Sequence, residues 1–259
     1  MPIYLQKAVL HSEGFPDRYR YPFNLTLLQQ TRQLTFDTEV TLFVGENGTG
    51  KSTFLEALAT ACGVHIWRPP EGARYEVNPH EEQLCRHLTV EWTGDRVPGS
   101  FFAADIAHHF AHLVDEWAAN DAGQLKYFGG KSLVTQSHGQ SLLSLFRARY
   151  RVRGIYFLDE PEAALSPRSQ LELLRIMAEA TANGLAQFIV STHSPLLLAY
   201  PGASIYSFDR CPLERVRYEE TEHYRIYRSF LSNRGEWLES STQGATDEAS
   251  SHPDGGNGA

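Results

Sequence analysis

Short apolar runs alternate with amphipathic segments along most of the chain. Runs rich in β-branched and aromatic residues predict four buried strands: Val40–Val44, Ile155–Leu158, Gln187–Val190 and Ser204–Phe208. Apolar residues at helical spacing predict helices over Lys51–Cys62 and Ser169–Ala182. Because helices follow buried strands, the pattern predicts an α/β fold with a mainly parallel sheet covered by helices on both faces.

The segments outside this alternation predict additions to the sheet. Ile3–Leu10 and Asn24–Leu28 are strand-like and predict a small antiparallel section near the N-terminus. Residues 64–100 are rich in Pro and Gly, and helical patterns follow at 101–122 and 139–150. We therefore expect loops and helices to be inserted between the first two core strands.

The C-terminal part predicts a helix and a tail. Tyr218–Leu231 is amphipathic, and docking of this helix on the core is favoured over a site for a partner. Residues 236–259 are rich in Ser and Gly and lack apolar periodicity, which predicts a disordered acidic tail. We expect one domain over 1–235, with the insertion at about 64–150, followed by this tail.

Composition narrows the classes of protein. The 259 residues carry a net charge of −8, and residues 236–259 hold five acids and no Lys or Arg, which leaves −3 for the rest. This near balance argues against a protein that binds nucleic acid over its whole surface.

The arginines of 147–153 predict a solvated edge, with a phosphate or partner contact as the alternative. Three cysteines, and apolar runs far shorter than the roughly 18 residues of a membrane span, predict a cytoplasmic protein without such a span.

The segment after the first core strand matches the phosphate-loop pattern G-x-x-x-x-G-K-[ST]. Its residues, with the one that follows, are Gly45, Glu46, Asn47, Gly48, Thr49, Gly50, Lys51, Ser52 and Thr53. In such a loop the glycines let main-chain N–H groups point inward at an anion, and the helix N-terminus adds positive potential. Lys51 is expected to reach the outer phosphates of the ligand, and Ser52 to place its hydroxyl on Mg²⁺.

Two adjacent acids end the second predicted core strand. Asp159 and Glu160 follow Ile155–Leu158, and ligands of parallel sheets gather at the carboxyl ends of the strands. Asp159 is expected to hold Mg²⁺, and Glu160 to take a proton from the attacking water. A plain acidic surface feature is the alternative for this pair, and the neighbouring phosphate loop disfavours it.

Three further segments indicate which kind of phosphate-loop protein this is. They are Ser137–Gln140, the block Asp159–Pro167, which reads Asp-Glu-Pro-Glu-Ala-Ala-Leu-Ser-Pro, and Ser191–Pro195. With the phosphate loop, they make residues 1–235 resemble the ATP-binding-cassette ATPase superfamily, and in particular its soluble AAA-family, SMC-like members. Taken alone, the first and last pieces could also be a helix start and a strand-end turn.

The resemblance implies roles for these pieces and a mode of assembly. Ser137, Gly139 and Gln140 correspond to the signature motif, and His193 to the switch histidine. Two subunits would sandwich two ATP molecules, with Ser137 Oγ and the Gly139 main chain touching the γ-phosphate in trans and His193 sensing it in cis. Two departures stand out: Ser166 replaces the usual Asp of the D-loop, and His138 replaces a signature Gly.

These observations predict a Mg²⁺-dependent ATPase that hydrolyses ATP to ADP and phosphate as an ATP-sandwich homodimer. It would drive an unidentified protein partner or a DNA-linked process. One alternative is the nucleotide-binding subunit of an ABC transporter. Another is a nucleotide-dependent scaffold without hydrolysis, for which Ser166 and His138 would mark decayed catalysis.

Overall fold

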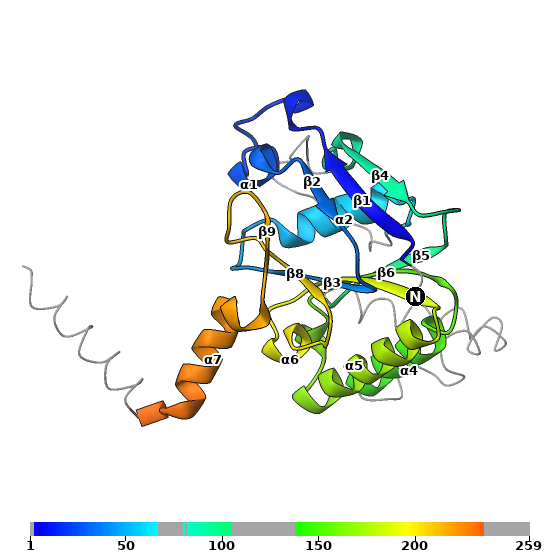
Figure 1. Cartoon of the computed structure of the whole chain (residues 1–259), viewed down its shortest axis with the longest axis vertical. Helices are drawn as coiled ribbons and strands as arrows, with labels where there is room; N and C mark the ends of the chain where they lie inside the picture. Colours follow the sequence, from blue (N-terminus) through cyan, green and yellow to red (C-terminus); the bar gives the residue numbers. More distant parts are fainter. Residues whose placement is uncertain (1–2, 67–79, 81, 105–137, 236–259) are drawn as a thin grey trace, which may run out of the picture.

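The computed structural model describes residues 3–66, 80, 82–104 and 138–235 (Figure 1). The predictions for Ser137, for most of the 101–122 helix and for the tail at 236–259 therefore lie outside the described residues.

The main sheet carries the four predicted core strands. Its order is β5-β6-β7-β3-β8-β9, and all neighbours pair in parallel except β8 and β9. The strands are β3 (Val40–Val44), β5 (Gly99–Ala103), β6 (Gly154–Asp159), β7 (Ala186–Ser191), β8 (Ser204–Ser207) and β9 (Glu214–Val216). Four of them match the predicted runs, which confirms the mainly parallel sheet.

A second sheet packs over the first. Its antiparallel strands lie in the order β2-β1-β4 and are β1 (Leu5–Leu10), β2 (Gln33–Thr35) and β4 (Leu88–Trp92). The small antiparallel section is thus confirmed, but the prediction of a strand at Asn24–Leu28 is wrong. That segment enters helix α1 (Thr26–Gln30), which buries the adjacent Leu27 and Leu28, and Thr31 Oγ1 donates back to the Leu27 carbonyl at 2.6 Å.

Two strands lie where the sequence predicted loops and a helix. Strand β4 falls inside 64–100, and β5 covers 99–103, so the start predicted for the 101–122 helix is wrong. Strand β5 pairs with β6 from Gly99 opposite Ile155 to Ala103 opposite Asp159. A Cβ on Gly99 would lie 2.8 Å from the Ile155 carbonyl oxygen. The residue that looked like a loop signal therefore permits close approach of the two strands.

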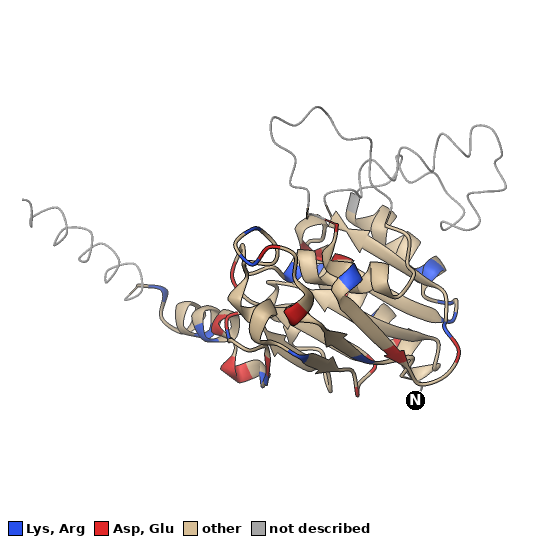
Figure 2. Ribbon diagram, turned by 90° about the horizontal axis from the view of Figure 1, so that it is seen from above, with Lys and Arg blue, Asp and Glu red and all other residues tan. Residues whose placement is uncertain are grey.

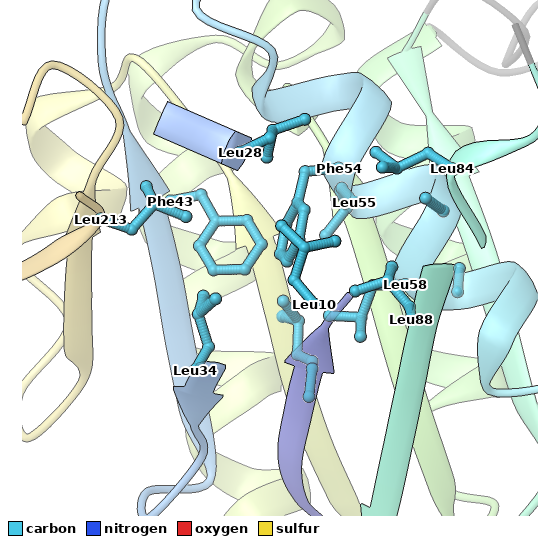
Figure 3. Close-up of a cluster of buried hydrophobic side chains, with 14 of the residues drawn as sticks. Leu10, Leu28, Leu34, Phe43, Phe54, Leu55, Leu58, Leu84, Leu88 and Leu213 are labelled. Carbon is cyan, nitrogen blue, oxygen red and sulfur yellow. The ribbon is translucent and has the colours of Figure 1, made fainter. Parts of the chain in front are cut away.

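Alternating side chains of β3 divide the core into two layers. Phe43 packs against Phe54 of helix α2 (Lys51–Ala61), with ring centroids 5.7 Å apart, under the small sheet (Figure 3). Val40, Leu42 and Val44 point to the other face. That face is covered by α4 (His138–Arg149), α5 (Pro167–Ala182) and α6 (Pro195–Leu198) (Figure 1). The predicted helices at 51–62, 139–150 and 169–182 are confirmed.

Within the described ranges, four short 3₁₀ segments join these elements. They are η1 (Ser12–Gly14), η2 (Leu84–His87), η5 (Pro161–Ala164) and η6 (Tyr218–Glu220).

The last described helix, α7 (Glu222–Ser232), does not dock by its apolar side. None of its residues is buried, and Ile226, Tyr227 and Leu231 are 43%, 50% and 68% exposed. Figure 1 shows α7 leaving the body of the protein from its first turn. The prediction of a helix is confirmed, but docking of its length on the core is wrong. The contact between His223 and His193 anchors the first turn of α7, whereas the apolar side chains further along the helix are exposed.

Charged residues of both signs are interspersed over the face seen in Figure 2. Two arginines of the 147–153 segment make charged or aromatic contacts within the chain: Arg147 pairs with Glu172 at 2.7 Å, and Arg153 lies over the ring of Tyr4 at 5.1 Å. Within the described ranges, no helix combines the length and apolar character that crossing a bilayer requires.

Candidate nucleotide-binding and hydrolysis site

The parallel strands bring four segments to one edge of the main sheet. Register pairs Phe43 with Ser191, Asp159 with Ser191, and Val44 with Ser207. The residues that follow β3, β6, β7 and β8 therefore meet at the carboxyl ends of the strands. This is the edge where doubly wound sheets bind their ligands.

The phosphate loop joins β3 to α2 in a conformation that needs glycine. Gly48 and Gly50 have φ values of 80° and 95°, in the left-handed region. A Cβ on Gly50 would also lie 2.5 Å from Leu25 Cδ1. The N-terminus of α2 has no side-chain cap, and Thr49 Oγ1 instead donates to the Glu46 carbonyl at 2.8 Å. The amides of the first turn are thus available to an anion.

Lys51 lies buried inside this loop. Its Nζ donates to the main-chain carbonyls of Gly45 at 2.7 Å and of Glu46 at 2.9 Å. Burial lowers the pKa of Lys51, and the nearby carboxylates of Glu160, Asp209 and Asp159 oppose that shift. A phosphate in the loop would offer the ammonium an anionic partner in addition to these neutral carbonyls.

Ser52 and Asp159 form the pair that could hold a metal ion. Ser52 Oγ donates to Asp159 Oδ1 at 3.1 Å, across 107 positions of sequence. Burial raises the pKa of Asp159 to about 6, and the hydrogen bond from Ser52 opposes this shift. A hydroxyl and a buried carboxylate are the hard oxygen ligands that Mg²⁺ takes beside phosphates, so the residues present fit that ion. Among the described residues, no cluster of three or more His, Cys, Asp or Glu side chains could hold a metal ion.

Glu160 is held in a strained conformation. Its φ of 44° and ψ of 51° are left-handed, which among the described non-glycine residues occurs here alone. Its N–H donates to the Ser191 carbonyl at 2.9 Å, which fixes the turn against β7. Such strain concentrates at functional sites. The side chain is partly exposed, and its Oε1 lies 3.3 Å from His193 Nε2.

His193 is fixed from two sides. Its main-chain N–H donates to Glu162 Oε1 at 2.5 Å, and its ring Nδ1 lies 3.1 Å from His223 Nε2 of α7. Burial raises the pKa of Glu162 and lowers the pKa of His223. Ser194 then caps α6 through its hydroxyl. No local sequence signal assigns a role to Glu162 or His223, because Glu162 lies within the block that follows Asp159 and His223 lies on an amphipathic helix.

Two further side chains, those of Asp209 and Tyr21, contact the phosphate loop. Asp209 Oδ1 accepts the Glu46 N–H at 2.8 Å, and it could have been found as an acid directly after a core strand. The Tyr21 hydroxyl contacts Thr53 Oγ1 beside the loop.

Gly139 and Gln140 of the signature-like motif lie on another part of the molecule. Gly139 and Gln140 are on α4, which covers the face of the sheet opposite α2. Gly139 has Ser169 Oγ and the Ala164 carbonyl among its nearest neighbours. Ser166, where the resemblance expects Asp, caps α5 by accepting from the Ser169 N–H at 3.4 Å. Serine serves this cap as well as aspartate does.

A glycine-rich loop between a parallel strand and a helix, with a buried lysine and a strand-end aspartate bonded to the loop serine, defines a P-loop nucleotide-binding fold. Comparisons with known proteins agree. Residues 137–199 match the family model described as "AAA domain, putative AbiEii toxin, Type IV TA system", and residues 23–81 match one described as "AAA domain".

Curated relatives specify the family. The chain is 30% identical to the thiamine import ATP-binding protein ThiQ of Cereibacter sphaeroides, over 59% of this chain and 69% of that protein. It is 29% identical to the hemin import ATP-binding protein HmuV of Nocardia farcinica, over 62% of this chain and 60% of that protein. The chain therefore belongs to the ATP-binding-cassette ATPases, and it is a P-loop NTPase that binds ATP. For HmuV the match spans less than two thirds of that protein's length.

Solved structures that resemble this chain include the SMC head domain from Thermotoga maritima. The TM-score is 0.43 at 18% identity, over 79% of this chain and 94% of that one. For the ATP-binding subunit of an ABC transporter the TM-score is 0.45 at 18% identity, over 88% of this chain and 93% of that one.

Proposed function

We propose that this chain is a cytoplasmic Mg²⁺-dependent ATPase that hydrolyses ATP between two copies of itself. The observation that carries the proposal is the hydrogen bond between Ser52 of the phosphate loop and Asp159 at the end of β6. It places the residue types needed for phosphate and for metal side by side, with Lys51 and Glu160 next to them.

Each of these side chains has a chemical task in hydrolysis. Lys51 and the loop amides would hold the β- and γ-phosphates, and Ser52 and Asp159 would hold Mg²⁺, which when bound neutralises charge on the phosphate oxygens. Glu160 would take one proton from a water molecule. The water oxygen then bonds to the γ-phosphorus while the bond to the bridging oxygen of ADP breaks. His193 would contact an oxygen of the γ-phosphate of the ATP that its own chain binds.

The second copy would supply Gly139, Gln140 and Ser137 in trans. Support for this arrangement comes from the position of Gly139 beside Ala164 and Ser169. The segment that resembles the signature motif therefore lies next to the segment that resembles the D-loop. Splitting the donors to one phosphate between two chains would couple hydrolysis to assembly.

Measurements of ATP turnover and of oligomeric state together test this proposal. Wild-type protein should hydrolyse ATP in the presence of Mg²⁺, and Lys51→Ala should lose that activity. Glu160→Gln should retain ATP and elute as a dimer in gel filtration with ATP and Mg²⁺, while Lys51→Ala stays monomeric. Turnover no higher than that of Lys51→Ala would favour the nucleotide-dependent scaffold. A monomer under every condition would refute the sandwich.

A transporter subunit is the second candidate, because the curated relatives ThiQ and HmuV are described as import ATP-binding proteins. Cofractionation of the chain with membranes, lost on a salt wash, would favour it. A protein partner or DNA that co-purifies with Glu160→Gln in ATP would favour the first candidate.

A further inference from the structure

The ring of His193 lies between Glu160 and a second histidine from α7. Its Nε2 is 3.3 Å from Glu160 Oε1, and its Nδ1 is 3.1 Å from His223 Nε2. The two imidazole centroids are 5.2 Å apart at an angle of 48°. This contact joins residues 30 positions apart and ties the last described helix to the hydrolysis site.

We propose that His223 is a positioning residue for His193: it fixes the imidazole so that Nε2–H faces the γ-phosphate. This inference rests on the proposed ATPase function. It concerns a residue of α7 outside the phosphate loop, the acid pair and the motifs that the sequence singled out.

The direction of the hydrogen bond follows from the surroundings of the pair. A neutral imidazole carries one N–H, so one ring must donate to the other. If His193 donated from Nδ1, its Nε2 would present a lone pair to the Glu160 carboxylate. Donation from His223 Nε2 instead leaves the proton of His193 on Nε2, where it faces Glu160 and would face a phosphate oxygen.

Among the described residues, His193 Nε2 and His223 Nδ1 are buried atoms without a hydrogen-bond partner. The open Nε2 is at the Glu160 side, where the γ-phosphate would lie. The contact between the rings therefore uses the nitrogen that the phosphate does not need, and it leaves the other nitrogen for the ligand. A residue that orients a functional histidine through its second ring nitrogen affects activity without touching the substrate.

The first turn of α7 is built to hold His223 in place. Thr221, the N-cap, is buried and accepts the Tyr224 N–H through its hydroxyl. The Tyr218 hydroxyl donates to the Pro195 carbonyl at 2.9 Å, two residues after His193. Tyr218 and Tyr224 pack with centroids 4.7 Å apart. The end of α7 that carries His223 is thus anchored to the segment that carries His193, although the rest of α7 is exposed.

The test compares substitutions of His223 that place a side-chain amide at different distances from the main chain of α7. In His223→Gln the amide can reach the position of Nε2, whereas in His223→Asn it stops one bond short. We expect His223→Ala and His223→Asn to lower kcat for ATP about tenfold, with KM and ATP affinity changed less than twofold, and His223→Gln to recover most of the loss. Tyr227→Ala, half exposed on the same helix, is the control for general disturbance of α7 and should keep wild-type kcat.

Three results would overturn the inference: wild-type kcat in His223→Ala, equal losses in the Gln and Asn variants, or an equal loss in Tyr227→Ala. A thermal melt of each variant separates loss of folding from loss of rate. If the wild-type chain has no turnover above Lys51→Ala, the proposed function fails. The inference is then decided by ¹⁵N NMR of His193, which should show the Nε2–H tautomer in the wild-type protein and lose that preference in His223→Ala. An Nδ1–H tautomer in the wild-type protein would refute it.

Discussion

Asp159→Asn should stabilise the nucleotide-free protein while abolishing its use of Mg²⁺. Asp159 is only 9% exposed, and burial raises its pKa from 3.8 to about 6. A carboxyl whose pKa is raised on folding contributes stability that is present below 3.8 and is lost as the pH rises through about 6. At about 1.4 kcal/mol per pH unit, the ionised carboxylate costs the folded wild-type protein about 3 kcal/mol above pH 7. Asparagine does not ionise, and its Oδ1 can still accept from Ser52.

Thermal melts of both proteins from pH 5 to pH 8 measure this difference. Without nucleotide, the variant should melt higher by about 6–10 °C at pH 8, and by about half of that at pH 5. With ATP and Mg²⁺ the order should reverse, because ligand binding stabilises only the protein that can hold the ion. A variant that melts at or below the wild-type temperature at pH 8 would refute the burial argument. An unchanged response to ATP and Mg²⁺ would refute the assignment of Asp159 to the metal.

Substitutions at three further positions test the geometry of the site. Gly50→Ala should lower ATP affinity at least tenfold in equilibrium binding, because a φ of 95° is strained for any L side chain and a Cβ would also displace the Leu25 methyl, which would lie 2.5 Å away. Wild-type affinity would contradict the loop geometry. Glu160→Gly should raise the free energy of unfolding by about 1 kcal/mol in urea, since it relieves the left-handed φ of 44°, and should abolish ATP turnover; a loss of stability would contradict the strain. Glu162→Ala should lower kcat for ATP more than Glu162→Gln does, because only the longer side chain can still accept the His193 N–H; equal rates would show that this bond does not matter.

The sequence predicted the central strands and the phosphate loop because each carries a strong local signal. The buried strands are short apolar runs, and the loop has glycines at the positions that need left-handed backbone. Asp159 and Glu160 followed from their place after such a strand. The edge strand β5 was missed because Gly99, which permits its contact with β6, has the appearance of a loop residue.

The residues around His193 could not be predicted, because their roles depend on contacts between distant segments. His223 lies 30 positions from His193, and Glu162 lies 31 positions from it. Nothing in the local pattern distinguishes His223 from the polar residues beside it on α7. The apolar stripe of α7 suggested docking along its length, but the structure anchors the helix by its first turn.

Calorimetric titration with ATP tests the central claim most directly. With Mg²⁺, the wild-type chain should bind ATP with measurable heat at one site per chain, and Lys51→Ala should show none. Omitting Mg²⁺, or changing Asp159 to Asn, should weaken binding. If the wild-type chain and Lys51→Ala give the same heat, the loop between β3 and α2 does not hold a triphosphate, and the account of this site is wrong.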